Sequence, residues 1–543
     1  MPPQTPPDTL AADRPTDKKR STPSLFRRIV RVVLSKTFLA ALLALLQIVV
    51  FFGLIYWFAN IGAMAYGAIT VITVLVLVVV LEKDDLNPAY KLMWTLVILL
   101  MPIFGAVFYL VWGHRTVPRK KRRLLLEIDA RTKATLRQDN AVMDALKQQD
   151  DHLAQSAHYL LQNASSPVYP ATHTEYYPLG EDFFPRFLDS IKAAEKYIFM
   201  QYYIWEEGVM LDATLQVLQE KVAEGVDVRL MWDGFGSLFT LPPGYDKKLR
   251  AMGIQVAVFS PLELTTHVSD YAMLNHRDHR KLTVVDGTVA FSGGLNVADE
   301  YINVKERFGV WKDTSFMVCG PAVYSMVTTF LHAWDYATAT VTNLEDYRLP
   351  APVPPPPLTL ENGFVQPYWD SPLDGENVSE NAYLNILRHA HNYVYISTPY
   401  LILDNEMITN LTLAAKSGVD VRILTPGIPD KPKVFMVTQS YYPVLLRSGV
   451  RIFEYTPGFN HAKMYVSDDK VAIIGSANMD YRSLYLHFEN CASFYGGIIV
   501  GQAKADMEAS FAVAHEVSYE ETQNISLFRR IAQIVARFFA PLL

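Results

Sequence analysis

Two separate stretches of the sequence carry the same polar residues at the same spacing. In each stretch a Lys stands two positions after a His, and an Asp stands seven positions after it. A Gly and an Asn follow 14 and 17 positions after the His. Such a pattern arises by chance at roughly 10⁻⁷ of start positions at average residue usage, so its repetition indicates a shared role. The pairs are His279 and His461, Lys281 and Lys463, Asp286 and Asp468, Gly293 and Gly475, and Asn296 and Asn478.

The residue types in this pattern favour chemistry on a phosphate group. Each stretch has the β-rich segments and turn residues of two strands joined by a turn. Because side chains two positions apart on a strand share a face, each His projects beside its Lys. The Gly lets backbone approach a ligand, and the Asn offers an amide donor. Lysine and amide donors stabilise charge on a phosphate, while His can attack phosphorus or move a proton.

Two copies of the pattern would supply one His as nucleophile and the other as general acid. A single such His would have a simpler interpretation, as an ordinary surface or core residue, but the matched pair argues against it. A metal site is the other alternative. We do not favour it, because a Lys two residues from each His is a poor neighbour for a cation and no cluster of Cys or carboxylates accompanies the pair. The sequence therefore predicts neither a metal nor a cofactor.

The composition separates the possible partners. Half of the 543 residues are apolar and only 19% are charged, which suggests a membrane component. The net charge of −6 argues against nucleic acid as a partner bound by bulk electrostatics. The only two cysteines, Cys319 and Cys491, stand in apolar, strand-like contexts, and we expect buried thiols. A link between the two is the alternative, so the redox compartment stays undecided.

Three uncharged apolar runs near the N-terminus predict transmembrane helices. The runs are Phe38–Phe58, Ile61–Leu81 and Leu92–Trp112, and each has 21 residues, close to the ~20 that cross a bilayer. Basic residues precede the first run and follow the third, which would place both flanks in the cytoplasm and requires an even number of spans. Three spans conflict with this rule, so the side of the membrane that bears the site stays open.

Strand-helix-strand order recurs in two later parts of the chain and predicts an α/β fold. The pentapeptide Gly225–Arg229 recurs unchanged at Gly418–Arg422, so we expect two pseudo-repeated halves that share one active-site cleft. A tract with six prolines joins the halves as a semi-rigid linker. The predicted parts are a disordered basic tail (1–36), a membrane anchor (37–113), a helical connector (114–165), the first half (166–348), the linker (349–358) and the second half (359–543).

The second half ends in a predicted amphipathic helix within residues 525–543. One face holds Leu527, Ile531, Ile534, Phe538 and Leu542, and the other holds Ser526, Arg530, Gln533 and Arg537. Docking of this helix against the domain core is one interpretation. Contact with an anionic membrane is the second.

The doubled pattern His-x-Lys-x₄-Asp with Gly-Gly/Ser-x-Asn resembles the phospholipase D superfamily. With the apolar runs and the ending Ala540–Leu543, the chain is similar to bacterial cardiolipin synthases of the two-motif type from about Ile61 onward. The resemblance implies two phospholipase D-like halves and a phosphatidyltransferase reaction. One phosphatidylglycerol would pass its phosphatidyl group to another through a phosphatidyl-His intermediate, giving cardiolipin and glycerol. It also implies a multi-pass protein of the bacterial cytoplasmic membrane.

The resemblance implies roles for the motif residues. His279 would be the nucleophile and His461 the general acid and base. The catalytic motifs are completed by Lys281, Asp286, Lys463 and Asp468, although both Asp residues stand at turns where they could hold a loop instead. The substrate phosphate would be bound by Asn296, Asn478, Gly294 and Ser476 together with the lysines.

Each catalytic His also needs a group that orients its ring. In the superfamily a Glu about 28 positions after the motif His bonds that His, and Glu489 stands at this offset from His461. Arg307 stands at the same offset from His279, which departs from the pattern. Asp313, in a nearby strand, is the candidate there.

Three other functions are compatible with parts of this pattern. A hydrolase would use water as acceptor and release phosphatidic acid, and a related phosphatidyltransferase would use another lipid. The apolar runs and acidic balance count against a nuclease, and the two complete motifs count against an inactive scaffold. The sequence leaves open the donor and acceptor lipids and the oligomeric state.

Overall fold

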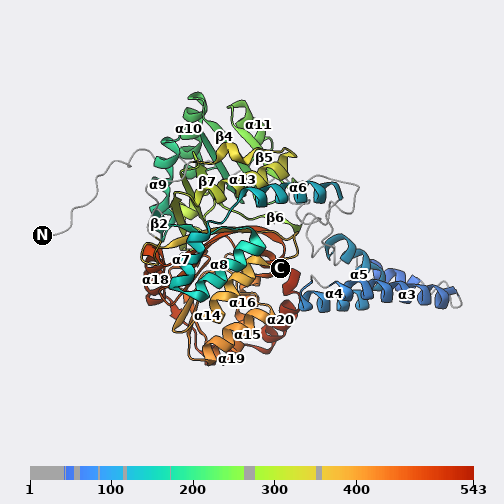
Figure 1. Cartoon of the computed structure of the whole chain (residues 1–543). Coiled ribbons are helices and arrows are strands. Elements are labelled where there is room, and N and C mark those ends of the chain that lie inside the picture. The colour runs from blue at the N-terminus through green and yellow to red at the C-terminus, as the bar shows by residue number, and fades with distance from the viewer. Residues whose placement is uncertain are drawn as a thin grey trace. The chain divides into compact units, whose positions relative to one another are not determined.

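The computed structural model describes residues 42, 45–53, 61–83, 86–113, 119–171, 173–261, 275–349 and 358–542 (Figure 1). The predicted tail and nearly all of the predicted linker lie outside the described residues. The chain forms two compact units. One takes residues up to 84 together with 94–109, and the other takes 85–93 and 110–543.

The smaller unit is helical. Its helices are α3 (Ile61–Glu82), most of α4 (Pro88–Leu100) and α5 (Pro102–Phe108), which continues into the π-helical turn η1 (Tyr109–Gly113). Gly105 lets α5 lie close to α4, because a Cβ at this position would stand 2.6 Å from the carbonyl oxygen of Val97.

The prediction of N-terminal transmembrane helices is wrong. In the part of the chain that the structure describes, no helix is both long enough and apolar enough to cross a membrane. The predicted multi-pass membrane localisation rested on these helices, and the structure does not support it. The third predicted run is divided, because α4 ends at Leu100 and Pro102, which lacks an amide hydrogen, starts a new helix of seven residues. Of the first run only residues 42 and 45–53 are described, and the side chains of α3 are described from Tyr66 onward.

The first half of the larger unit is built on a seven-stranded sheet with the order β2-β10-β8-β7-β3-β4-β5. The three strands β3, β4 and β5 are parallel, and the others pair in antiparallel fashion. The strands are β2 (His173–Tyr177), β3 (Tyr197–Tyr202), β4 (Asp227–Asp233), β5 (Gln255–Phe259), β7 (Leu282–Val285), β8 (Val289–Gly293) and β10 (Ser315–Cys319). The helices are α9 (Gly180–Lys192), α10 (Val209–Ala223), α11 (Tyr245–Ala251) and α13 (Val323–Thr338), with the 3-10 turns η3 (Asp299–Ile302) and η4 (Leu344–Tyr347).

The second half is built on a ten-stranded sheet with the order β1-β11-β18-β17-β16-β12-β13-β14-β19, and β6 pairs with β18 beside this path. The first half lends this sheet β1 (Tyr169–Pro170) and β6 (Arg277–Asp278). The strands from the second half are β11 (Phe364–Asp370), β12 (Tyr393–Ser397), β13 (Asp420–Pro426), β14 (Arg451–Tyr455), β16 (Met464–Ser467), β17 (Val471–Gly475), β18 (His487–Tyr495) and β19 (His515–Glu516). The helices of the second half are α14 (Val378–His389), α15 (Asn405–Lys416), α16 (Pro432–Leu446), α17 (Tyr481–Tyr485), α18 (Gly497–Ala512), α19 (Tyr519–Gln523), α20 (Leu527–Phe538) and η5 (Ala540–Leu542).

The two halves repeat one another element by element. The series β3-α10-β4-α11-β5-β7-β8-β10-α13 corresponds to β12-α15-β13-α16-β14-β16-β17-β18-α18. The α/β part of the fold prediction is therefore confirmed. The halves share a buried core, in which Phe316 of β10 meets Phe494 of β18 with ring centroids 5.1 Å apart. Cys491 is buried and Cys319 partly buried, and both are free thiols, so no disulfide links them.

Helices α6 (Arg119–Thr135), α7 (Asn140–Gln149) and α8 (Asp151–Ala164) occupy the stretch predicted to be a helical connector. A small parallel pair, β9 (Val310–Lys312) with β15 (Gly458–Asn460), joins the two halves directly. Among the described residues, this pair and the pairing of β6 with β18 are the two places where a strand of one half is hydrogen-bonded to a strand of the other beside a motif histidine.

Candidate active site

The two motif histidines are held by backbone of the opposite half. His279 follows β6 and precedes β7, and its N–H donates to the carbonyl oxygen of Phe488 on β18 at 2.9 Å. His461 follows β15 and precedes β16, and its N–H donates to the carbonyl oxygen of Lys312 on β9 at 2.6 Å. The strand pairings across the halves thus bring both motifs to one site.

The carboxylates that orient the two rings are also exchanged between the halves. His279 Nδ1 lies 2.9 and 3.0 Å from the two carboxylate oxygens of Glu489. His461 Nδ1 lies 2.5 Å from Oδ2 of Asp313. The same-half assignment drawn from the sequence is therefore wrong, although both carboxylates do contact a motif histidine. We call these contacts the crossed pairs. Because Nδ1 donates to a carboxylate in each, Nε2 is the nitrogen that each ring has for substrate.

Ser476 and Gly294, whose binding of phosphate stays a prediction, lie against the carboxylates of the crossed pairs. Ser476 Oγ donates to Oε2 of Glu489 at 2.5 Å, and the same oxygen lies 3.0 Å from His279 Nδ1, so Ser476 helps to hold this carboxylate against the ring. Gly294 stands at the equivalent place in the first half. A Cβ there would lie 2.0 Å from Oδ1 of Asp313, so only Gly leaves room for this carboxylate.

The two motif lysines are buried beside the histidines. Lys281 Nζ donates to the carbonyl oxygen of His279 at 2.5 Å, and Lys463 Nζ donates to that of His461 and lies 2.8 Å from its Nδ1. Burial lowers the pKa of Lys281 to about 8 and that of Lys463 to about 7. The two lysine side chains therefore place positive charge beside both imidazole rings. This charge favours the binding of an anionic ligand.

Burial and the lysines together keep the imidazoles neutral. Burial is the largest cause that lowers the pKa of His461 to about 4, and Lys463 lowers it further while Asp313 opposes the change. The pKa of His279 is lowered well below its usual value by burial and by Lys281. A neutral imidazole carries the lone pair that attack on phosphorus requires.

The two motif asparagines differ in their surroundings. Asn296 is fixed within its own half, since Oδ1 accepts from the N–H of Ile204 at 3.0 Å and Nδ2 donates to Tyr301 Oη at 2.6 Å. Asn478 Nδ2 makes a long 3.4 Å contact with Asp480, and its buried Oδ1 has no hydrogen-bond partner among the described residues. Phosphate binding by either residue stays a prediction, and Asn478 has the less engaged amide.

Asp286 and Asp468 do not lie at the site. Each stands at the far end of its motif strand, with φ of 51° and 54°. Asp286 accepts hydrogen bonds from the N–H groups of residues 195–197, and Asp468 accepts them from those of residues 391–393. The structure therefore gives Asp286 and Asp468 the alternative role predicted from their place at turns, which is to hold a loop. It does not place them where they could take part in catalysis.

The fold is similar to that of a solved phospholipid enzyme. Phosphatidylserine synthase from Haemophilus influenzae matches with a TM-score of 0.54 and 14% identity, covering 72% of this chain and 98% of that one. At this identity the likeness concerns the fold alone. A family model described as "Cardiolipin synthase, PLD-like domain" matches residues 383–511, and one described as "Phospholipase_D-nuclease N-terminal" matches residues 68–114.

Curated proteins are similar to this chain over most of its length. A protein called cardiolipin synthase from Halalkalibacterium halodurans is 32% identical over 489 residues, covering 88% of this chain and 94% of its own. Another from Alkalihalophilus pseudofirmus is 33% identical over 480 residues, covering 87% and 92%. The chain belongs to the cardiolipin synthase family. An uncharacterized protein from Streptococcus mutans is 41% identical over 476 residues, covering 86% of this chain and 99% of its own.

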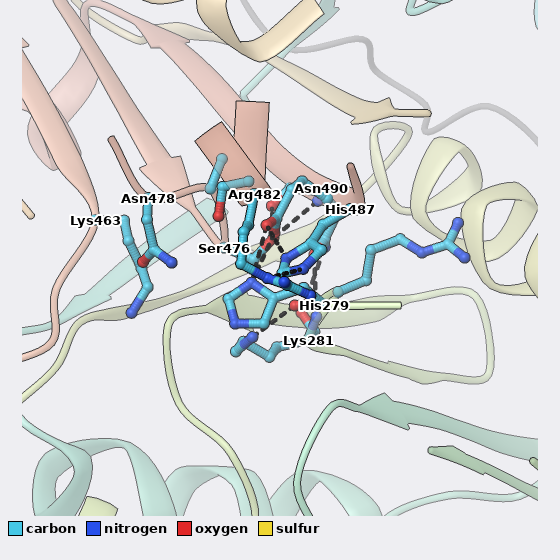
Figure 2. A network of polar contacts seen from close by, with 12 residues as sticks. His279, Lys281, Lys463, Ser476, Asn478, Arg482, His487 and Asn490 are labelled. Carbon is cyan, nitrogen blue, oxygen red and sulfur yellow. Dashed lines mark hydrogen bonds and ion pairs between the residues drawn. The ribbon is translucent and has the colours of Figure 1, made fainter. Parts of the chain in front are cut away.

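In this member of the cardiolipin synthase family, the sequence reasoning missed three polar residues of the site (Figure 2). Asn490 bridges the halves, because its Oδ1 accepts from the N–H of Lys281 at 3.0 Å and its Nδ2 donates to Ser292 Oγ at 2.8 Å. His487 lies 3.7 Å from Glu489 and receives a hydrogen bond from Arg482 Nε at 3.2 Å. Neither His487 nor Arg482 has a counterpart at a matching offset in the first motif, so the repeat gave no signal for them.

His279, His487 and Glu489 bring possible metal-ligand atoms within 4.8 Å of one another. The chemistry around them does not fit a cation. Glu489 already accepts hydrogen bonds from His279 and Ser476, and the positive charges of Lys281 and Lys463 lower the pKa of His279. A phosphate suits this environment better than a metal ion does. That the enzyme needs no metal stays a prediction.

Proposed function

We propose that the protein is a cardiolipin synthase that transfers a phosphatidyl group from one phosphatidylglycerol to the hydroxyl of another. The crossed pairs are the observation that carries this proposal. They present two neutral imidazoles, each oriented by a carboxylate, above two buried lysines. Two-step transfer at phosphorus needs one nucleophile and one group that gives and then takes a proton.

In the first step, His279 Nε2 attacks phosphorus and the bond from phosphorus to the glycerol oxygen breaks. The new N–P bond leaves a positive charge on the ring, and the carboxylate of Glu489 on Nδ1 stabilises that charge. His461 gives the Nε2 proton of its imidazolium to the departing glycerol oxygen. General-acid catalysis of this kind contributes about 10²–10⁴-fold.

In the second step, the now neutral His461 takes the proton of a hydroxyl of the second phosphatidylglycerol. That oxygen attacks phosphorus, the N–P bond breaks, and cardiolipin leaves with both histidines restored. No external energy source is needed, because the intermediate keeps the energy of the phosphoester bond. Lys281, Lys463 and Asn478 would stabilise the charge on the equatorial phosphate oxygens in both steps.

His461 must gain a proton before it can act as an acid. Binding of the anionic substrate would raise the pKa of its imidazole. An opposite charge nearby raises the pKa of an imidazole. The phosphate would add its negative charge to that of Asp313, which already lies 2.5 Å from Nδ1. The resemblance assigns the nucleophile to His279, and the proton donor is then His461.

Lipid product analysis on phosphatidylglycerol vesicles tests the proposed function. Wild type should give cardiolipin and free glycerol, and neither product should appear with His279→Ala or His461→Ala. Phosphatidic acid in place of cardiolipin would make the protein a hydrolase and overturn the transferase. A product that incorporates another lipid's headgroup would assign a different acceptor.

A donor with a good leaving group separates the roles of the two histidines. A phosphatidyl ester of p-nitrophenol needs no proton on its leaving oxygen. His461→Ala should therefore release about one equivalent of nitrophenol in a burst, while His279→Ala should release none. The reverse pattern would exchange the two roles and leave the synthase assignment intact.

A further inference from the structure

Helix α20 is attached to the second half by its polar side. Arg529 Nη2 donates to Gln439 Oε1 at 2.6 Å, and the guanidinium of Arg537 stands 4.2 Å from the ring centre of Tyr441. Both partners belong to α16. Ala536, on the same side of α20, packs against the buried core of the second half. The polar side of α20 therefore faces the domain, whereas a water-soluble protein would normally expose this side to solvent.

The apolar side of α20 faces outward. Phe528 is 82% exposed and Ile534 is 65% exposed, although both are large hydrophobic side chains. An amphipathic helix of a globular protein normally buries this stripe. The helix does dock against the second half, which was the first of the two interpretations from sequence, but it does so through its polar side and leaves the apolar side outward. The exposed stripe consists of Leu527, Phe528, Ile531, Ile534, Val535 and Phe539.

The charges on α20 restrict what can cover this stripe. The helix carries Arg529, Arg530 and Arg537 and no acidic residue. An apolar stripe flanked only by cations is complementary to an anionic lipid bilayer, whose headgroups attract arginine while its acyl chains accept the apolar side chains. We propose that α20 lies flat in the interface of an anionic bilayer with its exposed stripe among the acyl chains.

The helix is tied directly to the elements around the site. The turn η5 follows α20 and packs on α17, and its Ala540 is buried. α17 begins directly after the second motif and carries Arg482, which contacts His487 beside Glu489. A bilayer held by α20 would therefore set the height of the site above the lipid surface. This last step rests on the proposed function, since the proposed substrates are anionic lipids.

An environment-sensitive fluorophore at the stripe tests the contact. It is attached through Phe528→Cys in full-length protein that also carries His279→Ala, to prevent turnover, and Cys319→Ser, since Cys491 is buried. Vesicles of phosphatidylglycerol and phosphatidylcholine should shift its emission to the blue. The same label at Val209→Cys, an exposed position of the first half, should not shift.

Three results would overturn the proposal. One is an unchanged emission at position 528. Another is an equal shift with pure phosphatidylcholine vesicles, which would remove the anionic requirement. The third is a blue shift without vesicles that grows with protein concentration, which would make a second copy of the chain the occupant.

Activity provides an independent test. Ile531→Asp combined with Ile534→Asp should lower kcat/KM on phosphatidylglycerol vesicles about tenfold, because two apolar side chains leave the lipid. Activity on short-chain phosphatidylglycerol dispersed in solution should stay unchanged, as should that of the control Val209→Asp on both substrates. Equal losses on both substrates would overturn the role of α20. Wild type that made no cardiolipin from either substrate would instead count against the proposed function.

Discussion

Asp313 and Glu489 occupy equivalent positions in the two halves. Each stands two residues before the strand residue that pairs with the motif glycine, namely Ser315 opposite Gly293 and Cys491 opposite Gly475. Each nevertheless orients the histidine of the other half. Pseudo-symmetry and exchange together make one composite site, in which neither half holds a complete histidine-carboxylate pair of its own.

Loss of the carboxylate charge in a crossed pair should slow the reaction without unfolding the protein. Glu489→Gln keeps the side-chain size but no longer favours the Nδ1–H tautomer or the positive ring. We expect kcat to fall by about 10²–10⁴-fold, with Tm within a few degrees of wild type. Steady-state kinetics and thermal unfolding check this. Glu376→Gln, at the end of the loop before α14, is the matched control, and an equal loss there would contradict the role of Glu489.

Gly294 should tolerate no side chain. Gly294→Ala places a Cβ 2.0 Å from Oδ1 of Asp313, which must move away from His461. We expect kcat to fall about 10²-fold or more, because the ring loses its orienting carboxylate. Gly501→Ala on α18 is the control, since no atom lies within 4 Å of its added Cβ. Wild-type kcat in Gly294→Ala would mean that Asp313 is not needed in this position.

The motif aspartates should affect stability rather than chemistry. Asp468→Ala removes the acceptor of three backbone N–H groups and places Ala at a φ of 54°. We expect a loss of about 2–4 kcal/mol in unfolding free energy, from unpaired donors and backbone strain. Denaturant unfolding measures it. The folded fraction should keep a kcat within about threefold of wild type, and a normal stability with a lost kcat would contradict this assignment.

The repeat in the sequence was sufficient to find the two histidines, the two lysines and the α/β halves, because a shared offset reflects a shared strand-turn-strand unit. It could not give the exchange of carboxylates. Asp313 follows His279 by 34 positions and Glu489 follows His461 by 28, so a fixed offset pointed to Arg307. The six extra residues lie in the loop between β8 and β10 and leave the strand register unchanged.

Hydrophobicity alone was a poorer guide than spacing. It predicted spans in the N-terminal runs but did not register Pro102 as a helix start. For α20 the apolar periodicity was correct, yet periodicity cannot say which side of a helix faces the domain. The contacts of Arg529 and Arg537 with α16 decide that, and they depend on tertiary structure.

Substrate capture should weaken as Lys463 loses its proton. Burial lowers the pKa of Lys463 to about 7, so the ammonium is present below that pH and lost above it. An anionic phosphate binds the charged form, and kcat/KM should therefore fall as the pH rises from about 7 to 9. Lys463→Arg, whose charge persists at every pH in this range, should move the decline to higher pH, where Lys281, with a pKa of about 8, loses its proton. A decline at the same pH in Lys463→Arg would assign it to another group.

Glu380 should make the protein less stable as the pH rises. Burial, and next the neighbouring Asp404, raise the pKa of Glu380 to about 9. Asp404 itself accepts hydrogen bonds from Tyr485 and from Asn87. In the unfolded chain a Glu ionises near pH 4.3, whereas in the folded protein Glu380 keeps its proton to a much higher pH. Its contribution to stability is full below about pH 4 and is lost as the pH rises toward 9.

Replacement by a neutral isostere isolates this effect. Glu380→Gln cannot ionise in either state, so its Tm relative to wild type should rise steadily from pH 5 to pH 9. Thermal unfolding at pH 5, 7 and 9 measures the difference. Glu361→Gln, at a position away from Glu380 and Asp404, controls for the general effect of removing one negative charge. A Tm difference between Glu380→Gln and wild type that does not change with pH would contradict this prediction. It would mean that Glu380 is already ionised in the folded protein across this pH range.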